Sequence, residues 1–202
     1  MNIKSHNWIK TYTNKHIDYN NLDPNQICIT DIAHHLSLEN RFMGQSEAAY
    51  SVANHLLFCL AIAKHLGYTP YLCLRVLMHD FAEAYVKDIP TPLKRLLPDF
   101  MAVEARFEWA IEEWFGLPEL SETEKDLVKR VDLIALKMEK EALLNCNDDW
   151  AQLDGVTTVP ITLKVLSPKT AEAELKQAFH RAYEAVFNVI LSSTEIEQQR
   201  AA

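Results

Sequence analysis

Tyr71-Leu-Cys-Leu-Arg-Val-Leu-Met-His-Asp-Phe-Ala-Glu83 is an apolar run that carries two adjacent ionisable residues, His79 and Asp80. Another histidine, His55, lies upstream, and an isolated aspartate, Asp132, lies downstream, each within a hydrophobic helical pattern. An imidazole or carboxylate on the core face of a helix loses hydration worth roughly several kcal/mol unless it is paired or bound to a cation. The pattern therefore predicts a buried metal site shared by three helices.

The four residues offer a donor set of two imidazoles and two carboxylates. Such a set suits Mn, Co, Fe, Ni or Zn, and Mg is also compatible with it. Three or four protein ligands leave coordination positions open for water and a substrate oxygen, and open positions distinguish a catalytic metal from a structural one. We therefore expect a divalent transition metal as the cofactor.

Composition and charge limit the class of protein. The 202 residues are 49% hydrophobic, which is enough for one core, and we expect a single domain over residues 1–202 with a polar tail after about residue 193. The net charge of −8 argues against binding to polymeric nucleic acid but allows a small phosphorylated ligand. The four cysteines lack a C-x-x-C pair, and no signal peptide or membrane-spanning stretch is evident. We expect a cytoplasmic protein with reduced core thiols and no membrane partner.

The pattern along the chain predicts an all-α fold with two minor extended elements. Residues 8–19 alternate around Asn14-Lys15 and predict a hairpin. Two prolines within 88–94 must end the preceding helix, and the β-branched run 156–166 is expected to be a short extended segment. Charged residues at 108–114 and 137–141 are expected on solvated faces. The predicted helices cover residues 30–38, 47–65, 71–85, 103–115, 121–144 and 167 to about 191.

More ionisable groups gather around the His-Asp pair. His79 and Glu83 share a helix face at i and i+4, Asp80 lies alongside, and Asp88 follows at the start of the loop. A helix C-terminus carries a partial negative charge, which disfavours packed carboxylates unless a cation is present. This convergence strengthens the prediction of a metal site.

Five segments of the chain together form a specific pattern. They are Asp31-Ile-Ala-His-His-Leu-Ser-Leu-Glu-Asn-Arg41-Phe42, Tyr50-Ser-Val-Ala-Asn-His55, His79-Asp80-Phe-Ala-Glu83-Ala-Tyr, Asp88-Ile-Pro-Thr-Pro-Leu-Lys94 and Val131-Asp132. In these segments the chain resembles the HD-domain phosphohydrolases, and within them the compact branch of 5′-deoxynucleotidases and phage-type dATP triphosphohydrolases. The resemblance extends from about Trp8 to the final helix. It implies an all-α bundle of the HD type, with His55, His79, Asp80 and Asp132 as the metal ligands.

The resemblance also implies roles for neighbouring residues. Glu83 would act as the acid or base toward the attacking water or the leaving oxygen, and Asp88 would orient that water. Arg41 and Lys94 would supply positive charge to a phosphoryl group, and Phe42 would pack on a base or sugar. The alternatives are that Arg41 pairs with a helix carboxylate, that Lys94 is solvated and that Phe42 belongs to the core.

Two positions depart from the family pattern. Lys87 stands where relatives often have glycine, so either the backbone there needs no positive φ or the loop is adjusted. Asn54 stands where relatives often have glutamine, and the shorter amide is expected to change a hydrogen bond behind the metal ligands.

The resemblance implies that the protein is a metal-dependent phosphohydrolase of 5′-phosphorylated (deoxy)nucleosides. We expect a dNTP triphosphohydrolase of the dATP type, which releases nucleoside and triphosphate, because the extra basic residue Lys87 would help to hold the added charge. The alternatives are a 5′-deoxynucleotidase acting on dNMPs and a non-catalytic nucleotide-sensing or nucleotide-binding protein. A cyclic-nucleotide phosphodiesterase fits less well, since the chain has one H…HD…D set. The expected partners are the nucleotide and a second copy of the chain, the latter suggested by the aromatic residues Trp109, Trp114 and Phe115.

Overall fold

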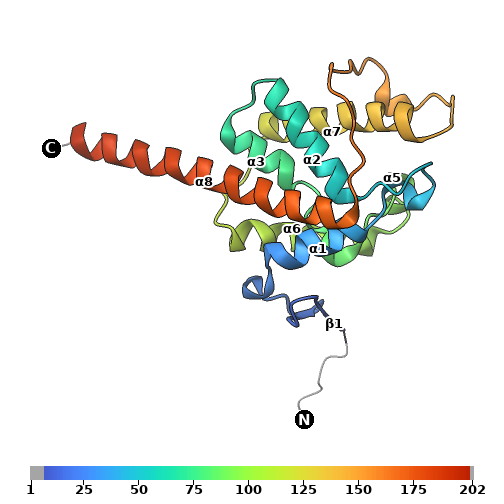
Figure 1. The fold of residues 1–202 in the computed structure, drawn as a ribbon. Helices are drawn as coiled ribbons and strands as arrows, with labels where there is room; N and C mark the ends of the chain where they lie inside the picture. The colour runs from blue at the N-terminus through green and yellow to red at the C-terminus, as the bar shows by residue number, and fades with distance from the viewer. Residues whose placement is uncertain (1–6, 201–202) are drawn as a thin grey trace, which may run out of the picture.

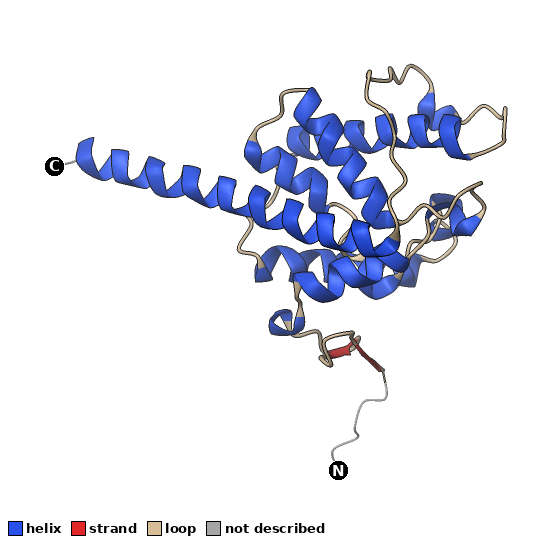
Figure 2. Cartoon of the chain, viewed as in Figure 1, coloured by secondary structure: helices blue, strands red, loops and turns tan. Residues whose placement is uncertain are grey.

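The computed structural model describes residues 7–200. Helices make up most of it, and the sheet found in this range is a two-stranded hairpin near the N-terminus (Figure 2). The predicted all-α fold class is therefore confirmed. The elements are β1 (Trp8–Lys10), β2 (His16–Asp18), η1 (Pro24–Gln26), α1 (Ile29–Leu38), η2 (Arg41–Gly44), α2 (Val52–His65), α3 (Pro70–Met78), α4 (Glu83–Val86), α5 (Thr91–Lys94), α6 (Pro98–Trp114), α7 (Glu122–Leu143), η3 (Ala151–Leu153) and α8 (Pro168–Arg200).

The N-terminal hairpin forms as predicted. β1 pairs with β2 in antiparallel register, with Ile9 opposite Ile17, and Asn14 takes a left-handed φ of 66° in the turn. Ile17 is fully buried. The backbone N–H and the hydroxyl of Thr13 each donate to a carboxylate oxygen of Asp31 at 2.7 Å. These bonds attach the hairpin to α1.

The longer helices pack side by side into a bundle (Figure 1). α1 lies against α8, α2 packs against α3 and α7, and α3 also contacts α8. α8 crosses the bundle, and its C-terminal part projects beyond it (Figure 1). The core lies between the apolar faces, and Leu74, Phe81, Phe107 and Leu175 are among its largest fully buried side chains.

α2 begins at Val52 rather than at residue 47, where the hydrophobic pattern suggested. The hydroxyl of Ser51 caps the helix by accepting from a backbone N–H of the first turn. Upstream, Arg41 N donates to Tyr50 O at 2.9 Å, so the chain between them closes into a loop instead of extending the helix. The loop returns Arg41 to the N-terminal end of α2.

The predicted helix over 71–85 is divided into α3 and α4. Between them, Phe81 N donates to Met78 O at 2.9 Å and Glu83 N donates to Asp80 O at 3.1 Å, so the turn is tightened to i→i+3 bonding. After this turn, Asp80 Oδ2 lies 3.5 Å from His55 of α2, and His79 Nε2 lies 3.9 Å from Asp132 of α7, so the two adjacent residues reach the same centre.

The proline-containing segment ends the preceding helix as predicted, but it also contains the short helix α5. Pro92 lies in the first turn of α5, where a missing N–H removes no helical bond. α6 likewise begins at Pro98, earlier than the predicted residue 103. Proline therefore occupies the first turn of both of these helices.

α7 begins at the predicted capping box of Ser121 and Glu124. Residues 156–166 form neither a helix nor a strand in the described chain, so the segment that was expected to be extended has no strand partner. The side chain of Asn54 replaces a strand partner: its Oδ1 accepts from Leu166 N at 2.7 Å, and its Nδ2 donates to Leu166 O at 3.3 Å. The amide thus fixes the end of the loop rather than a metal ligand.

α8 continues to Arg200, past the predicted end near residue 191 and through the expected polar tail. After Pro168 the chain contains no glycine or proline, so no residue strongly interrupts the helix. Ser167 caps the start as predicted, because its hydroxyl accepts from Thr170 N at 3.3 Å.

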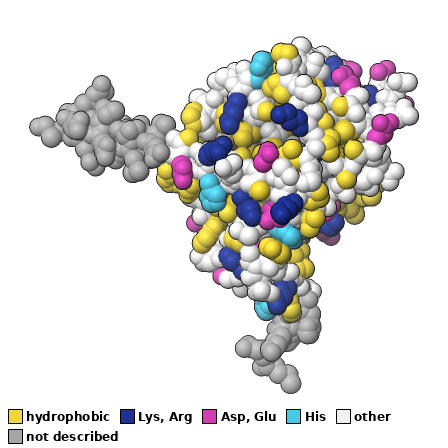
Figure 3. All heavy atoms as spheres, viewed as in Figure 1, with side chains coloured by type: hydrophobic (Ala, Val, Ile, Leu, Met, Phe, Trp, Pro, Cys, Tyr) yellow, Lys and Arg dark blue, Asp and Glu magenta, His cyan; other side chains and the backbone are white. Residues whose placement is uncertain are grey.

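Other expectations concern the surface and the thiols. None of the helices within residues 7–200 combines the length and the apolar character needed to cross a bilayer. Figure 3 shows lysine and arginine side chains interspersed with acidic and hydrophobic ones on the face that is drawn. The four cysteines are free, and Cys59 and Cys73 are buried. Trp109 and Trp114 are exposed, but Phe115 is buried against Phe179, so it contributes to the core rather than to an exposed aromatic surface.

Candidate metal centre

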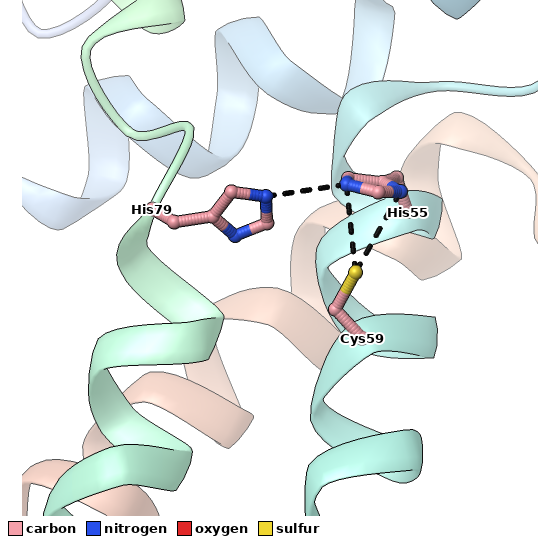
Figure 4. Close-up of side chains that lie close together, drawn as sticks. All are labelled: His55, Cys59 and His79. Atoms are coloured by element: carbon pink, nitrogen blue, oxygen red, sulfur yellow. Dashed lines mark hydrogen bonds between the residues drawn. The ribbon is translucent and has the colours of Figure 1, made fainter. Parts of the chain in front are cut away.

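The four predicted metal ligands converge between α2, α3 and α7. His55 Nε2 lies 3.3 Å from His79 Nε2 (Figure 4), 3.5 Å from Asp80 Oδ2 and 3.5 Å from Asp132 Oδ1. His79 Nε2 lies 3.4 Å from Asp80 Oδ2 and 3.9 Å from Asp132 Oδ1. The structure thus brings together all the residues that the sequence proposed as ligands.

This spacing fits a single divalent cation. With metal–donor bonds of about 2.1 Å and bond angles of about 90–109°, neighbouring donor atoms lie roughly 3.0–3.4 Å apart. The donor pairs measured here lie at or slightly above that range, between 3.3 and 3.9 Å. A small contraction would close the four atoms around one ion.

Both histidines are oriented for Nε2 ligation. His79 Nδ1 lies 2.7 Å from Val76 O, which can only accept, so Nδ1 carries the proton. His55 Nδ1 lies 2.7 Å from Glu139 Oε1, and a carboxylate at this distance selects the same tautomer. In the neutral form of both rings, Nε2 is therefore left with a lone pair directed at the shared centre.

The pKa shifts of His79 and Asp132 also indicate that the electrostatic potential at the centre is negative. Burial lowers the pKa of His79, but Asp80 and Asp132 outweigh it, and the pKa is raised above its ordinary value. Burial would raise the pKa of Asp132, yet hydrogen bonds from His55 and His79 hold it well below its ordinary value. A divalent cation would replace the protons that the carboxylates draw onto the imidazoles.

Cys59 is a neighbour that the sequence placed only in the core. Its sulfur lies 3.4 Å from His55 Nε2 and 3.7 Å from His55 Nδ1, and together with His79 it forms a group within metal-binding range (Figure 4). Because the two distances are nearly equal, the sulfur lies over the face of the imidazole and not along the in-plane lone pair. Burial raises the pKa of the thiol to about 11, which disfavours the thiolate that a metal requires.

Glu139 is the functional candidate that the sequence missed. Its charge was assigned to a solvated face, but the residue is completely buried. Oε1 accepts from the hydroxyl of Tyr50 at 2.9 Å as well as from His55, and Oε2 lies 3.3 Å from Arg41 Nη2. Although burial would raise the pKa of Glu139, Arg41 and His55 hold it at about 2. The available signal was its spacing: seven residues after Asp132, it lies on the same face of α7.

Arg41 lies between Glu139 and Asp80. Its Nη1 is 3.6 Å from Asp80 Oδ2, and its buried Nε has no hydrogen-bond partner. The alternative that Arg41 pairs with a helix carboxylate is therefore correct for Glu139, while the guanidinium also approaches Asp80, one of the predicted ligands. Phe42 is partly buried rather than in the core, and Arg41 lies 5.4 Å from its ring centroid. Phe42 and Met43 both have positive φ, which forms the tight turn η2.

Glu83 and Lys94 lie on the opposite side of Asp80. Glu83 is buried, and burial together with the charges of Asp80 and Asp88 raises its pKa well above its ordinary value. Its Oε2 has no hydrogen-bond partner. Lys94 Nζ lies 2.6 Å from Glu104 Oε1 and 3.6 Å from Glu83 Oε1, so it is ion-paired rather than solvated. Glu83 is thus a carboxyl whose neutral form the surroundings favour.

The loop that carries Asp88 is strained. Lys87 has φ 78° and ψ 153°, a conformation that is almost restricted to glycine. The positive φ is therefore kept, contrary to the alternative in which the backbone there does not need it. Lys87 Nζ lies 2.6 Å from Glu39 Oε2, while burial and Asp80 raise the pKa of Asp88 against the lowering effect of Arg41. The backbone strain fixes the point at which the chain turns back toward the centre.

A cavity of about 790 Å³ opens onto the centre between α3, α6 and α7. His79, Asp80 and Asp132 contribute to its lining, and the exposed side chain of Trp109 forms part of the α6 wall. Residues 108–114 were expected on a solvated face, and several of them form the α6 wall of this cavity. The charged residues that line the cavity beside the ligands are Arg75, Glu108, Glu112, Glu113, Glu119, Lys125 and Lys129.

Comparison with known proteins identifies relatives of the chain. No protein-family model matches it. It is 39% identical over 150 residues to the uncharacterized protein YfdR of Escherichia coli (strain K12), a match that covers 74% of this chain and 80% of YfdR. It is 30% identical over 159 residues to the uncharacterized protein RCAP_rcc00048 of Rhodobacter capsulatus, covering 76% of this chain and 80% of that protein. The chain belongs to the family that contains YfdR.

Proposed function

We propose that the protein is a divalent-metal-dependent phosphohydrolase of the HD type that acts on 5′-phosphorylated (deoxy)nucleosides. The observation that carries this proposal is the convergence of two Nε2 atoms and two carboxylate oxygens at 3.3–3.9 Å. The Nδ1 hydrogen bonds of both histidines, and the motif resemblance of the chain, support it further.

Each residue around the centre would have a separate role in hydrolysis. A divalent cation, when bound, supplies Lewis acidity to a phosphoryl oxygen and lowers the pKa of water. Glu83, with its raised pKa, would give a proton to the leaving oxygen, and Asp88 would orient the attacking water. The buried guanidinium of Arg41 would donate to the phosphoryl oxygens, where low dielectric strengthens each charged hydrogen bond.

The charge distribution favours a substrate with one phosphate over a triphosphate. Lys94 pairs with Glu104, Lys129 pairs with Asp132 at 2.7 Å, and Arg75 pairs with Glu112. The sequence argument for a triphosphate relied on Lys87, whose ammonium is bound to Glu39. Among the cations named here, Arg41 alone has a buried N–H without a partner. One phosphate therefore matches the available donors better than three.

The test is an incubation of metal-stripped protein with added Co²⁺, Mn²⁺ or Mg²⁺ and a panel of nucleoside mono- and triphosphates. Nucleoside and phosphate formed from monophosphates would support the 5′-deoxynucleotidase reaction. Nucleoside together with intact triphosphate would support the dNTP triphosphohydrolase reaction instead. Tight nucleotide binding without product under all metals would contradict hydrolysis and favour a sensing role.

A further inference from the structure

Glu139 is a charged residue with no contact to solvent. It lies on α7 seven residues beyond Asp132, so the two carboxylates are on one helix face, about two turns apart. A buried carboxylate costs several kcal/mol, roughly, unless partners compensate its lost hydration. Because Glu139 is 0% exposed, neighbouring groups must supply the hydrogen bonds and positive charge that water would otherwise give its carboxylate.

The partners of Glu139 come from two separate parts of the site. Oε1 accepts from His55 Nδ1 at 2.7 Å and from the hydroxyl of Tyr50 at 2.9 Å. Oε2 faces Arg41 Nη2 at 3.3 Å and has no other partner. One carboxylate thus connects a candidate metal ligand with the arginine that faces the candidate phosphate position.

Each contact determines the orientation of a different group. The short bond from Nδ1 fixes the His55 tautomer and directs Nε2 to the point shared with His79. The ion pair fixes one amino group of Arg41, so that the other lies 3.6 Å from Asp80 Oδ2 and the Nε–H is left without a partner. A guanidinium held in this way is preorganised for an anion beside the metal.

We propose that Glu139 is a positioning residue that serves the metal site through Oε1 and the anion site through Oε2. This inference rests on the proposed function in requiring a metal at His55. It extends that function because the affinity for the metal and the affinity for an anion both depend on one carboxylate. A merely structural Glu139 would neutralise Arg41 and stabilise the fold without affecting either site.

The experiment compares wild type with Glu139→Gln and Glu139→Asp, and with Tyr50→Phe as the matched control. Tyr50→Phe removes one hydrogen bond from Oε1 but retains the carboxylate and its contacts with His55 and Arg41. Glu139→Asp retains the charge beside Arg41 but shortens the reach to His55, so it tests the metal contact even if the Gln variant does not fold. Circular dichroism checks the fold of each variant.

The readouts are the affinity for Co²⁺ by chelator competition, the Co²⁺ absorption spectrum, and the affinity of the Co²⁺-loaded protein for inorganic phosphate by calorimetry. We expect the Co²⁺ affinity of both Glu139 variants to fall about 10- to 100-fold with a changed spectrum, and that of Tyr50→Phe to stay within about threefold of wild type. Phosphate affinity should fall further in Glu139→Gln than in Glu139→Asp, because only the latter keeps an anionic partner for Arg41.

Folded Glu139 variants with an unchanged Co²⁺ affinity and spectrum would overturn the positioning role and leave the metal site intact. Loss of Co²⁺ affinity with unchanged phosphate affinity would overturn the link to Arg41. A wild-type protein that binds no Co²⁺ would overturn both this inference and the proposed function. The failure of either one is therefore distinguishable from the failure of the other.

Discussion

The two sides of the candidate metal centre are built differently. On the α7 side, Glu139 and His55 are completely buried, and a hydrogen bond of 2.7 Å connects them. On the α4 side, Glu83 has a buried oxygen without a partner, and the adjoining loop contains the strained Lys87. The first side has the features of a support that orients ligands, and the second has the crowded carboxylates and backbone strain typical of reacting groups. The difference indicates which residues are expected to affect metal affinity and which are expected to affect turnover.

The ligands are shared by both sides, so their removal should have the largest effect. We expect Asp80→Asn to lower metal affinity by more than about 100-fold and to abolish hydrolysis, because an amide keeps the shape of the side chain but loses the anionic donor. Metal content after dialysis and calorimetric titration with Co²⁺ measure this. Asp126→Asn, at an exposed aspartate of α7, is the matched control and should behave as wild type. Turnover by metal-replete Asp80→Asn would refute the assignment.

The contribution of Glu139, on the buried side, to the free energy of unfolding can be identified by its pH dependence. The pKa of Glu139 is about 2 in the folded chain and 4.5 ordinarily, so its contribution to stability is fully present above pH 4.5 and lost as the pH falls toward 2. This difference corresponds to about 3 kcal/mol. Glu139→Gln lacks this group, so its stability deficit relative to wild type should shrink by about that amount between pH 5 and pH 2.

Urea unfolding of the metal-free proteins in a chelator, at several pH values, measures this deficit. Titration of Asp132 occurs in both proteins and cancels in the difference. A deficit that stays constant over the same pH range would mean that the Glu139 carboxylate is not selectively stabilised by the fold.

The difference between the two sides also explains what the sequence could predict. The predicted ligands are polar residues within apolar patterns, so the sequence alone shows that they are unusual. They are His55, His79, Asp80 and Asp132. Glu139 lies between Lys137 and Lys140, in a segment whose pattern predicts a solvated helix face, so only the three-dimensional position of α7 shows that it is buried. Burial depends on which helix packs on which face, and the local pattern does not contain that information.

The fold shows the same limit. The all-α class, the hairpin and the capping box of α7 follow from local signals, since turn residues, alternation and capping residues act within a few positions. The start of α2 and the division between α3 and α4 do not follow from them. The first depends on a backbone bond from Arg41 to Tyr50, and the second on the placement of His79 and Asp80 toward two other helices. Such contacts override helical periodicity.

The strained side should respond to relief of its backbone conformation. Lys87→Ala removes the ion pair with Glu39 and keeps a Cβ at φ 78°, whereas Lys87→Gly removes the ion pair and the strain together. After allowing for the greater entropy of unfolded glycine, we expect Lys87→Gly to be more stable than Lys87→Ala by about 1 kcal/mol. Thermal unfolding of the two variants measures this as a difference of about 2–4 °C. Equal melting temperatures would show that the positive φ is not maintained in solution.

The smallest effect on metal affinity is expected from substitution of Cys59, which tests whether this buried neighbour of His55 is a metal ligand. The sulfur contacts the face of the His55 ring, and its thiol pKa of about 11 opposes ionisation. Cys59→Ser should therefore change Co²⁺ affinity by no more than about threefold, or about 0.7 kcal/mol. The Co²⁺ spectrum should show no sulfur-to-metal charge-transfer band in either protein. Cys73→Ser, at a buried thiol of α3 outside the centre, controls for the cost of burying a hydroxyl. A charge-transfer band that disappears in Cys59→Ser alone would make the thiolate a ligand, and the centre would then be a His55–Cys59–His79 site in which the two aspartates play a lesser part.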